Sequence, residues 1–92
     1  MIGSIRHKGL KRLYEDGDPR GIGANLRKRV SEILSVLDAA DSIEEADIPG
    51  YRLHPFSGDR QGYWSAKVTG KWRITFRFED GRAEEVTLED YH

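Results

Sequence analysis

Residues 71–78 read Lys71-Trp72-Arg73-Ile74-Thr75-Phe76-Arg77-Phe78, and apolar side chains alternate with polar or cationic ones along the whole stretch. Successive side chains of a β-strand point to opposite faces of the sheet, so this alternation predicts a strand with one apolar and one cationic face. The Asp80-Gly81 pair that follows tolerates the positive φ angles of a tight hairpin turn. We therefore expect a further strand over residues 82–88 or 82–89.

The chain before this stretch supplies the rest of the sheet. Residues 63–68 alternate in the same way and end at the turn Thr69-Gly70, which predicts an antiparallel meander from residue 63 to residue 88. Residues 51–56 form another strand candidate, and residues 2–6, which are too short for a secure assignment, have β-branched residues and can serve as a first strand.

Two helices are expected from spacings of three and four between apolar residues. Leu10, Leu13 and Tyr14 share one side of a short helix over residues 7–15, which Gly and Pro residues end at 17–21. A longer helix over residues 24–40 carries one apolar stripe, made of Leu26, Val30, Ile33, Leu34 and Leu37. After it, Ser42 with Glu45 three residues later predicts a capped turn of helix.

These elements predict an α+β domain in which two N-terminal helices pack on a small, mainly antiparallel β-sheet. A chain of 92 residues supports one core, so we expect a single domain over residues 1–92. The chain has no cysteine, which excludes disulfides, thiolate zinc sites, iron–sulfur clusters and a cysteine nucleophile. With no apolar run of membrane-spanning length and no signal-peptide core, we expect a cytoplasmic protein that makes no membrane contact.

The net charge of −1 hides an uneven distribution of charges. Between Arg52 and Arg77 lie six basic residues and one acidic residue, whereas acids gather at residues 38–47 and 79–90. A basic face on a nearly neutral protein attracts phosphate groups, although a mixed solvated surface would show the same counts.

The candidate functional residues are a histidine on the predicted cationic face and the three residues that end the chain. His54, Asp90, Tyr91 and His92 would meet Arg73 at the rim of the sheet. Two imidazoles, a carboxylate, a phenol and a guanidinium suit phosphodiester chemistry, because they can move protons, stabilise a charged phosphorane and stack on a base. A metal site formed by His54, Asp90 and His92 is disfavoured by the surrounding positive charge. We expect phosphate contacts from Arg52, Arg60, Lys71 and Arg77.

Four stretches of the chain resemble the HigB-type toxins of the RelE/ParE toxin superfamily. They are residues 9–11, residues 53–65 with Leu53-His54-Pro55-Phe56-Ser57-Gly58-Asp59-Arg60, residues 72–78, and the terminal Asp90-Tyr91-His92. Carried over by position, His54, Arg73, Asp90, Tyr91 and His92 match the family's active-site residues. In one departure from the family's pattern, Ser57 stands where many members have lysine.

The resemblance implies a toxin of a type II toxin–antitoxin pair. Such a toxin binds the A site of the small ribosomal subunit and cleaves mRNA without metal or other cofactor, until a helix-turn-helix antitoxin neutralises it. The superfamily also includes gyrase poisons on a similar scaffold, so fold alone does not choose the target. Three alternatives follow: a non-enzymatic poison of the gyrase-targeting type, a catalytically impaired relative that binds only the antitoxin, and a ribosome-independent RNase.

Overall fold

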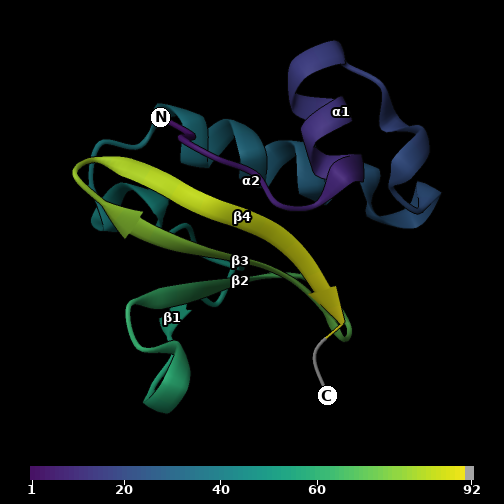
Figure 1. The fold of residues 1–92 in the computed structure, drawn as a ribbon. Coiled ribbons are helices and arrows are strands. Elements are labelled where there is room, and N and C mark those ends of the chain that lie inside the picture. Colours follow the sequence, from purple (N-terminus) through teal and green to yellow (C-terminus); the bar gives the residue numbers. More distant parts are fainter. Residues whose placement is uncertain (91–92) are drawn as a thin grey trace.

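The structure is a computed structural model, and it describes residues 1–90 of the 92-residue chain. Its sheet is an antiparallel meander in which each strand pairs with the next one along the chain (Figure 1). The predicted α+β class and the mainly antiparallel sheet are confirmed. The four strands are β1 (His54–Pro55), β2 (Tyr63–Thr69), β3 (Trp72–Glu79) and β4 (Arg82–Asp90).

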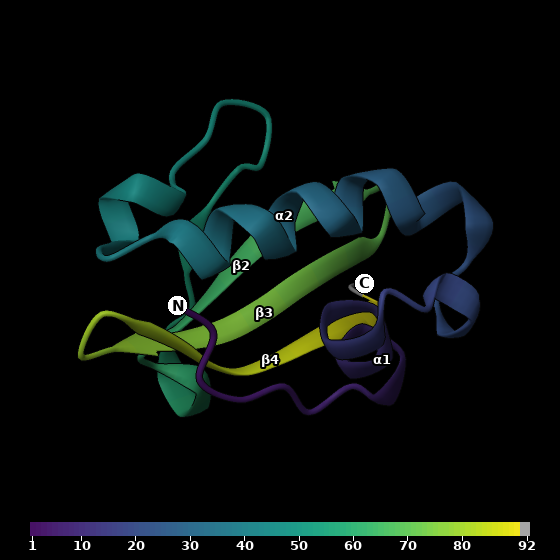
Figure 2. The same ribbon diagram turned by 90° about the horizontal axis from the view of Figure 1, so that it is seen from above.

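Both helices, α1 (Lys8–Asp16) and α2 (Arg27–Ala39), lie on the same side of the sheet. Seen from above in Figure 2, α2 runs lengthwise over the strands, and α1 lies near the end of β4. The predicted helices over 7–15 and 24–40 are thus confirmed, except that the second begins as a 3₁₀ turn, Ala24–Leu26.

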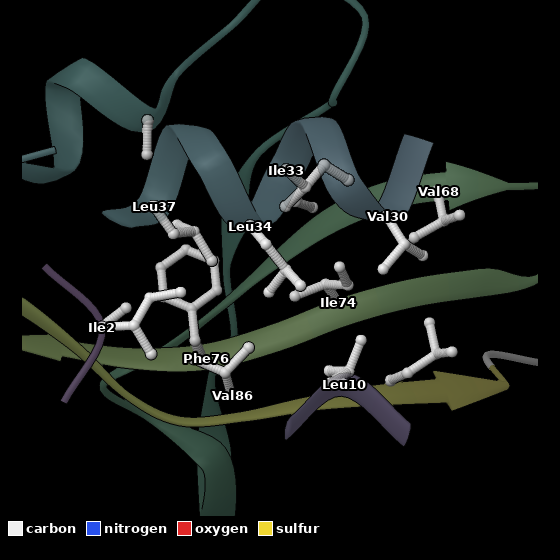
Figure 3. Close-up of a cluster of buried hydrophobic side chains, with 14 of the residues drawn as sticks. Ile2, Leu10, Val30, Ile33, Leu34, Leu37, Val68, Ile74, Phe76 and Val86 are labelled. Atoms are coloured by element: carbon white, nitrogen blue, oxygen red, sulfur yellow. The ribbon is translucent and has the colours of Figure 1, made fainter. Parts of the chain in front are cut away.

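The core lies between α2 and the sheet (Figure 3). All five residues of the predicted apolar stripe, which lie on α2 and the turn before it, are buried, and in Figure 3 the side chains of Leu34 and Leu37 point toward β3. The side chains of Ile74 and Phe76 on β3 are 0% exposed. Because full burial of one such side chain stabilises the fold by about 1.5–3 kcal/mol, this layer holds the helices on one face and leaves the other face of the sheet open to functional residues.

The N-terminal segment is not the separate strand that residues 2–6 predicted. Ile2 and Ile5 instead form single parallel bridges to Ala83 and Val86 of β4. The segment is also hydrogen-bonded to α2. Asp38 accepts a hydrogen bond from the Ile2 amide at 3.2 Å, and the N-terminal amine donates to backbone carbonyls at the end of α2. The segment therefore covers the outer edge of β4.

Two further local predictions are confirmed only in part. Of the strand expected over 51–56, only His54–Pro55 forms, because Arg52 has a left-handed backbone (φ 48°) and Pro55 has no amide N–H to donate. The predicted turn of helix forms over Ile43–Ala46 with Ser42 at its N-cap position, but the Ser42 side chain makes no capping bond, and Glu45 reaches back to the amide of Asp41 at 2.6 Å.

In the part of the chain that the structure describes, no helix has the length and apolar character needed to cross a membrane.

Candidate active site

The face of the sheet turned away from the helices gathers the polar side chains of the strands, and we call it the polar face. Cα pairing joins His54 of β1 to Ser65 of β2, Ser65 to Thr75 of β3, and Thr75 to Thr87 of β4. Because directly paired residues lie on the same face, these four side chains form one row across the sheet. The residues of the polar face are His54, Tyr63, Ser65, Lys67, Arg73, Thr75, Arg77, Glu85, Thr87 and Glu89.

His54 is half-buried at one end of this row, and a backbone carbonyl orients its ring. The His54 Nδ1 atom lies 3.1 Å from the carbonyl oxygen of Arg52. A carbonyl oxygen can only accept, so Nδ1 carries the proton in this contact and the lone pair of the neutral ring resides on Nε2. His54 thus has the tautomer that a general base needs at Nε2.

Arg73 reaches the same place from the neighbouring strand. Its Nη1 atom lies 3.5 Å from the Ser65 hydroxyl oxygen, and Ser65 is the residue that pairs with His54. The structure therefore brings together His54 and Arg73, the imidazole and guanidinium predicted from the sequence.

The polar face is not the cationic surface that the alternation of residues 71–78 predicted. Arg60 donates two hydrogen bonds to the Glu89 carboxylate, at 3.1 and 2.6 Å, and Thr75 donates a third. Arg77 is paired with Glu79 at 2.7 Å and with Glu85 at 3.1 Å. The acids that the sequence separates from the basic stretch return beside it on β4, so the positive charge of this face is largely balanced.

These contacts fix the ionisation of the carboxylates. The bonds from Arg60 hold the pKa of Glu89 below its ordinary value, although partial burial opposes this shift. Hydrogen bonds from the Tyr63 hydroxyl, at 2.9 Å, and from Arg77 lower the pKa of Glu85 in the same way. Both carboxylates are therefore charged at neutral pH.

A hollow of about 560 Å³ opens on the polar face beside the 3₁₀ turn Gly58–Arg60. It is lined by Arg6, Asp59, Arg60, Tyr63, Thr87 and Glu89. The Arg60 guanidinium carbon lies 4.4 Å from the ring centroid of Phe56 and 5.7 Å from that of Tyr63.

The remaining predicted residues lie apart from the row that joins His54 and Arg73. Arg52 is exposed and lies two residues before His54 in the chain. Lys71 precedes β3, and its Nζ atom lies 3.4 Å from the carboxylate of Asp90, the last residue of β4. Asp90 pairs with Trp72, so strand alternation turns it away from the polar face. Tyr91 and His92 lie outside the described residues.

Among residues 1–90, no group of three or more His, Asp or Glu side chains stands close enough to hold a metal ion. The metal site considered above includes His92, which lies outside this range.

Four residues of the polar face, Tyr63, Glu85, Thr87 and Glu89, were not predicted as functional residues from the sequence. The alternation of residues 82–90 could have placed Thr87 and Glu89 on one face of the last strand. The register shift that turns the Glu85 side chain to this face could not be predicted from the sequence, because none of the residues around it requires the left-handed backbone (φ 54°) that Glu85 adopts.

The fold is that of RelE-like toxins, a class of small α+β proteins with two helices on one face of an antiparallel sheet. The YoeB dimer of Staphylococcus aureus is similar with a TM-score of 0.61 and 14% sequence identity, covering 99% of this chain and 97% of that one. The YoeB–YefM complex of the same organism is similar with a TM-score of 0.59 and 13% identity, covering 100% and 98%.

Sequence comparison identifies the family. The family model described as the RelE-like toxin of the type II toxin–antitoxin system HigB matches residues 3–92, and the chain belongs to this HigB-like toxin family. It is 47% identical to Endoribonuclease HigB of Proteus vulgaris over 92 residues, the full length of both chains. It is 30% identical to Toxin HigB-1 of Vibrio cholerae over 93 residues, 99% of this chain and 98% of that one. As a toxin of a type II system, the protein has an antitoxin as its partner.

Proposed function

We propose that this toxin is an endoribonuclease that cleaves mRNA in the A site of the ribosome. The observation that carries the proposal is the placement of His54 and Arg73 beside the same residue, Ser65, on the polar face of the sheet. The 47% identical relative named as an endoribonuclease supports the reaction class. The ribosome as the place of cleavage, and with it a cytoplasmic location, follows from the family resemblance.

In the proposed reaction the 2′-hydroxyl of a ribose attacks the adjacent phosphorus atom. His54 Nε2 accepts the proton of this hydroxyl, the new bond from the 2′-oxygen to phosphorus forms, and the bond from phosphorus to the 5′-oxygen breaks. Arg73 stabilises the negative charge that develops on the phosphorane oxygens. The products are a 2′,3′-cyclic phosphate and a free 5′-hydroxyl.

Tyr91 and His92 are proposed to complete the site, with Asp90 as a positioning residue, because strand alternation turns Asp90 away from the polar face. One of these side chains is expected to protonate the leaving 5′-oxygen, and the phenol is suited to stacking on a splayed base. Arg52, Arg60, Lys71 and Arg77 are the candidate contacts to RNA phosphates, and we expect Arg60 and Arg77 to contribute less because carboxylates already bind them. The antitoxin is proposed to be of the helix-turn-helix type, as the family resemblance implies.

The test is the mapping of mRNA 5′ ends after incubation with purified protein. Message alone and message on programmed ribosomes are compared for the unmodified protein, for His54→Ala and for His92→Ala. We expect cleavage only on ribosomes, with a loss of about 10²–10⁴-fold when a group that transfers a proton is removed.

The matched control is His7→Asn, which removes a histidine that caps α1 through Nδ1 and replaces it with another capping residue. It should cleave like the parent. Full activity of both His54→Ala and His92→Ala would overturn the proposal, and growth arrest with intact messages would favour a non-enzymatic poison.

Ser57 offers a second test of the electrostatics. It is exposed and directly precedes the turn Gly58–Arg60, so the side chain can be lengthened without disturbing the core. We expect Ser57→Lys to raise the rate of cleavage on ribosomes, because a cation near the scissile phosphate stabilises the transition state. The uncharged Ser57→Gln variant is the control, and equal rates for the two would show that Arg60 and Arg73 already supply the charge.

A further inference from the structure

We propose that the hollow beside the turn Gly58–Arg60 binds one nucleobase of the RNA, and that it selects a base with an exocyclic amino group against uracil. This inference rests on the proposed function. It adds a specificity-determining site, separate from the groups proposed to react, whose volume of about 560 Å³ falls in the range of small-ligand sites.

The charge of the lining favours a base over a phosphate. Arg6 and Arg60 contribute two positive charges to the hollow, and Asp59 and Glu89 contribute two negative ones. A phosphate would gain little from a balanced set and would meet two carboxylates, whereas an uncharged ring with donors and acceptors can be bonded by such groups.

The hollow also contains a planar platform. The Arg60 guanidinium is stacked over Phe56 and Tyr63, and its two bonds to Glu89 hold the plane of the guanidinium in position. Aromatic rings and guanidinium planes are the surfaces on which proteins stack unpaired RNA bases.

The ring of Tyr63 is fixed by a strained residue. Glu85 adopts a left-handed backbone (φ 54°) at a register shift of β4, and its carboxylate accepts the Tyr63 hydroxyl hydrogen bond at 2.9 Å. A second bond, from the Glu85 amide to the Ser4 hydroxyl at 2.8 Å, holds this conformation. Such strain persists where the surrounding structure enforces it and is common at binding sites. Glu85 is thus a positioning residue that acts through Tyr63.

The selectivity follows from the hydrogen-bonding chemistry of the lining. The carboxylates of Asp59 and Glu89 can only accept, so they match the exocyclic amino groups of adenine, cytosine and guanine. An exocyclic amino group offers two N–H donors to these carboxylates, whereas uracil offers only one, N3–H, and the carbonyl oxygens on either side of it would face the carboxylates without a proton between them. Asp59 is exposed and has no hydrogen bond or ion pair within residues 1–90, so its carboxylate can take this role without loss of a fold contact.

The first experiment measures binding without any cleavage. Cytidine and uridine, which differ on the base only in the groups at positions 3 and 4, are titrated separately into the full-length protein while amide NMR shifts are followed. We expect cytidine to shift the amides of Tyr63 and Thr87 and to bind about fivefold more tightly than uridine, the factor of one hydrogen bond. Asp59→Asn should bring the two dissociation constants to within about twofold of each other, because an amide can also donate.

The matched control is Asp16→Asn, the same chemical change at an exposed site on α1, and it should keep the parent's preference. Equal constants for the two nucleosides in the parent, no shift of these amides, or an Asp59→Asn variant with the parent's preference would each overturn the proposal.

The second experiment maps cleavage on ribosomes programmed with messages randomised around the cut site. Among the messages cleaved by the parent and by Asp16→Asn, we expect uridine to be rarer than in the starting pool at one position near the cut. Among those cleaved by Asp59→Asn, its frequency at that position should rise toward that of the pool. Cleavage with no such depletion would overturn the base site and leave the endonuclease standing. Selective binding of cytidine by a protein that cuts no message would overturn the proposed function and leave the base site standing.

Discussion

His7 shows how one side chain sets both a helix end and a pH dependence. Its Nδ1 atom accepts a hydrogen bond from the Leu10 amide at 3.2 Å and so caps the first turn of α1. Burial lowers the pKa of the His7 imidazole below its ordinary value of 6.5, because the charged ring loses hydration. Protonation would convert the accepting nitrogen into a donor and remove the cap.

The folded protein should therefore lose stability as the pH falls through the range in which His7 becomes protonated. The pKa of His7 is lower in the folded chain than in the unfolded chain, so the unfolded chain binds more protons once the pH falls below about 6.5. We expect a lower melting temperature at pH 5.5 than at pH 7.5, with a loss no larger than that of an N-cap, about 0.5–2 kcal/mol. Thermal unfolding followed by circular dichroism measures it.

The His7→Asn variant separates this group from the others. Asparagine accepts through an oxygen that does not titrate, so the difference between pH 7.5 and pH 5.5 should shrink. Glu85 and Glu89 have lowered pKa values, and their contributions are lost only below their ordinary value of 4.5. An unchanged pH difference in His7→Asn would assign the effect to another group.

The contact of α1 with the turn Pro19–Gly21 depends on two glycines. A Cβ atom on Gly9 would lie 2.5 Å from the carbonyl oxygen of Gly21, and one on Gly21 would lie 2.7 Å from the Cα atom of Gly9. Two backbone segments meet here without side chains between them, so neither can yield without moving its element.

Gly9→Ala should therefore destabilise the fold by about 1–3 kcal/mol, as other overpacked sites do, despite the better helix propensity of alanine. Gly23→Ala is the control: its new Cβ would lie 3.3 Å from the flexible Asn25 side chain, and Gly23 has a φ of −53° that any residue adopts. Urea unfolding of both variants gives the comparison, and a Gly9→Ala variant as stable as Gly23→Ala would contradict the close approach.

The elements that could be predicted correctly from the sequence are those whose hydrophobic pattern extends over many residues. The stripe on residues 24–40 repeats over several turns, and residues 71–78 alternate over a whole strand, so tertiary contacts reinforce a local preference that is already clear. Residues 51–56 have too short a pattern, and the left-handed backbone at Arg52 could not be read from an arginine. That turn nevertheless supplies the carbonyl that orients His54.

At the scale of the molecule, local patterns do not show which distant residues come together. This decides which residues of the candidate site could be predicted from the sequence. His54 and Arg73 could be found because their residue types carry chemistry wherever the strands place them. The pairing of Glu89 with Arg60 could not be found, because the two residues are 29 positions apart in the chain and only the folded sheet brings them together. A count of charges along the chain therefore predicted a cationic face, whereas pairing across strands gives a face of alternating charges.

This balance predicts that the arginines of the molecule contribute unequally to RNA binding. Arg77 is held by Glu79 and Glu85, which raise its pKa and would have to be displaced by a phosphate. Arg52 is exposed and makes no ion pair within residues 1–90. We expect Arg52→Gln to reduce the slope of log K against log salt for a single-stranded RNA by about 0.7, the value for one lost phosphate contact.

Arg77→Gln should leave that slope nearly unchanged and instead lower the melting temperature, because Glu85, which also accepts the Tyr63 hydrogen bond, loses the guanidinium that it binds. Arg20→Gln is the control for an exposed arginine on the other side of the fold, where Arg20 pairs with Asp18 at 2.9 Å. Filter binding over a series of salt concentrations measures the slopes. Equal reductions for Arg52→Gln and Arg77→Gln would mean that RNA displaces the carboxylates of β4, and the polar face would then act as a cationic surface only when RNA is bound.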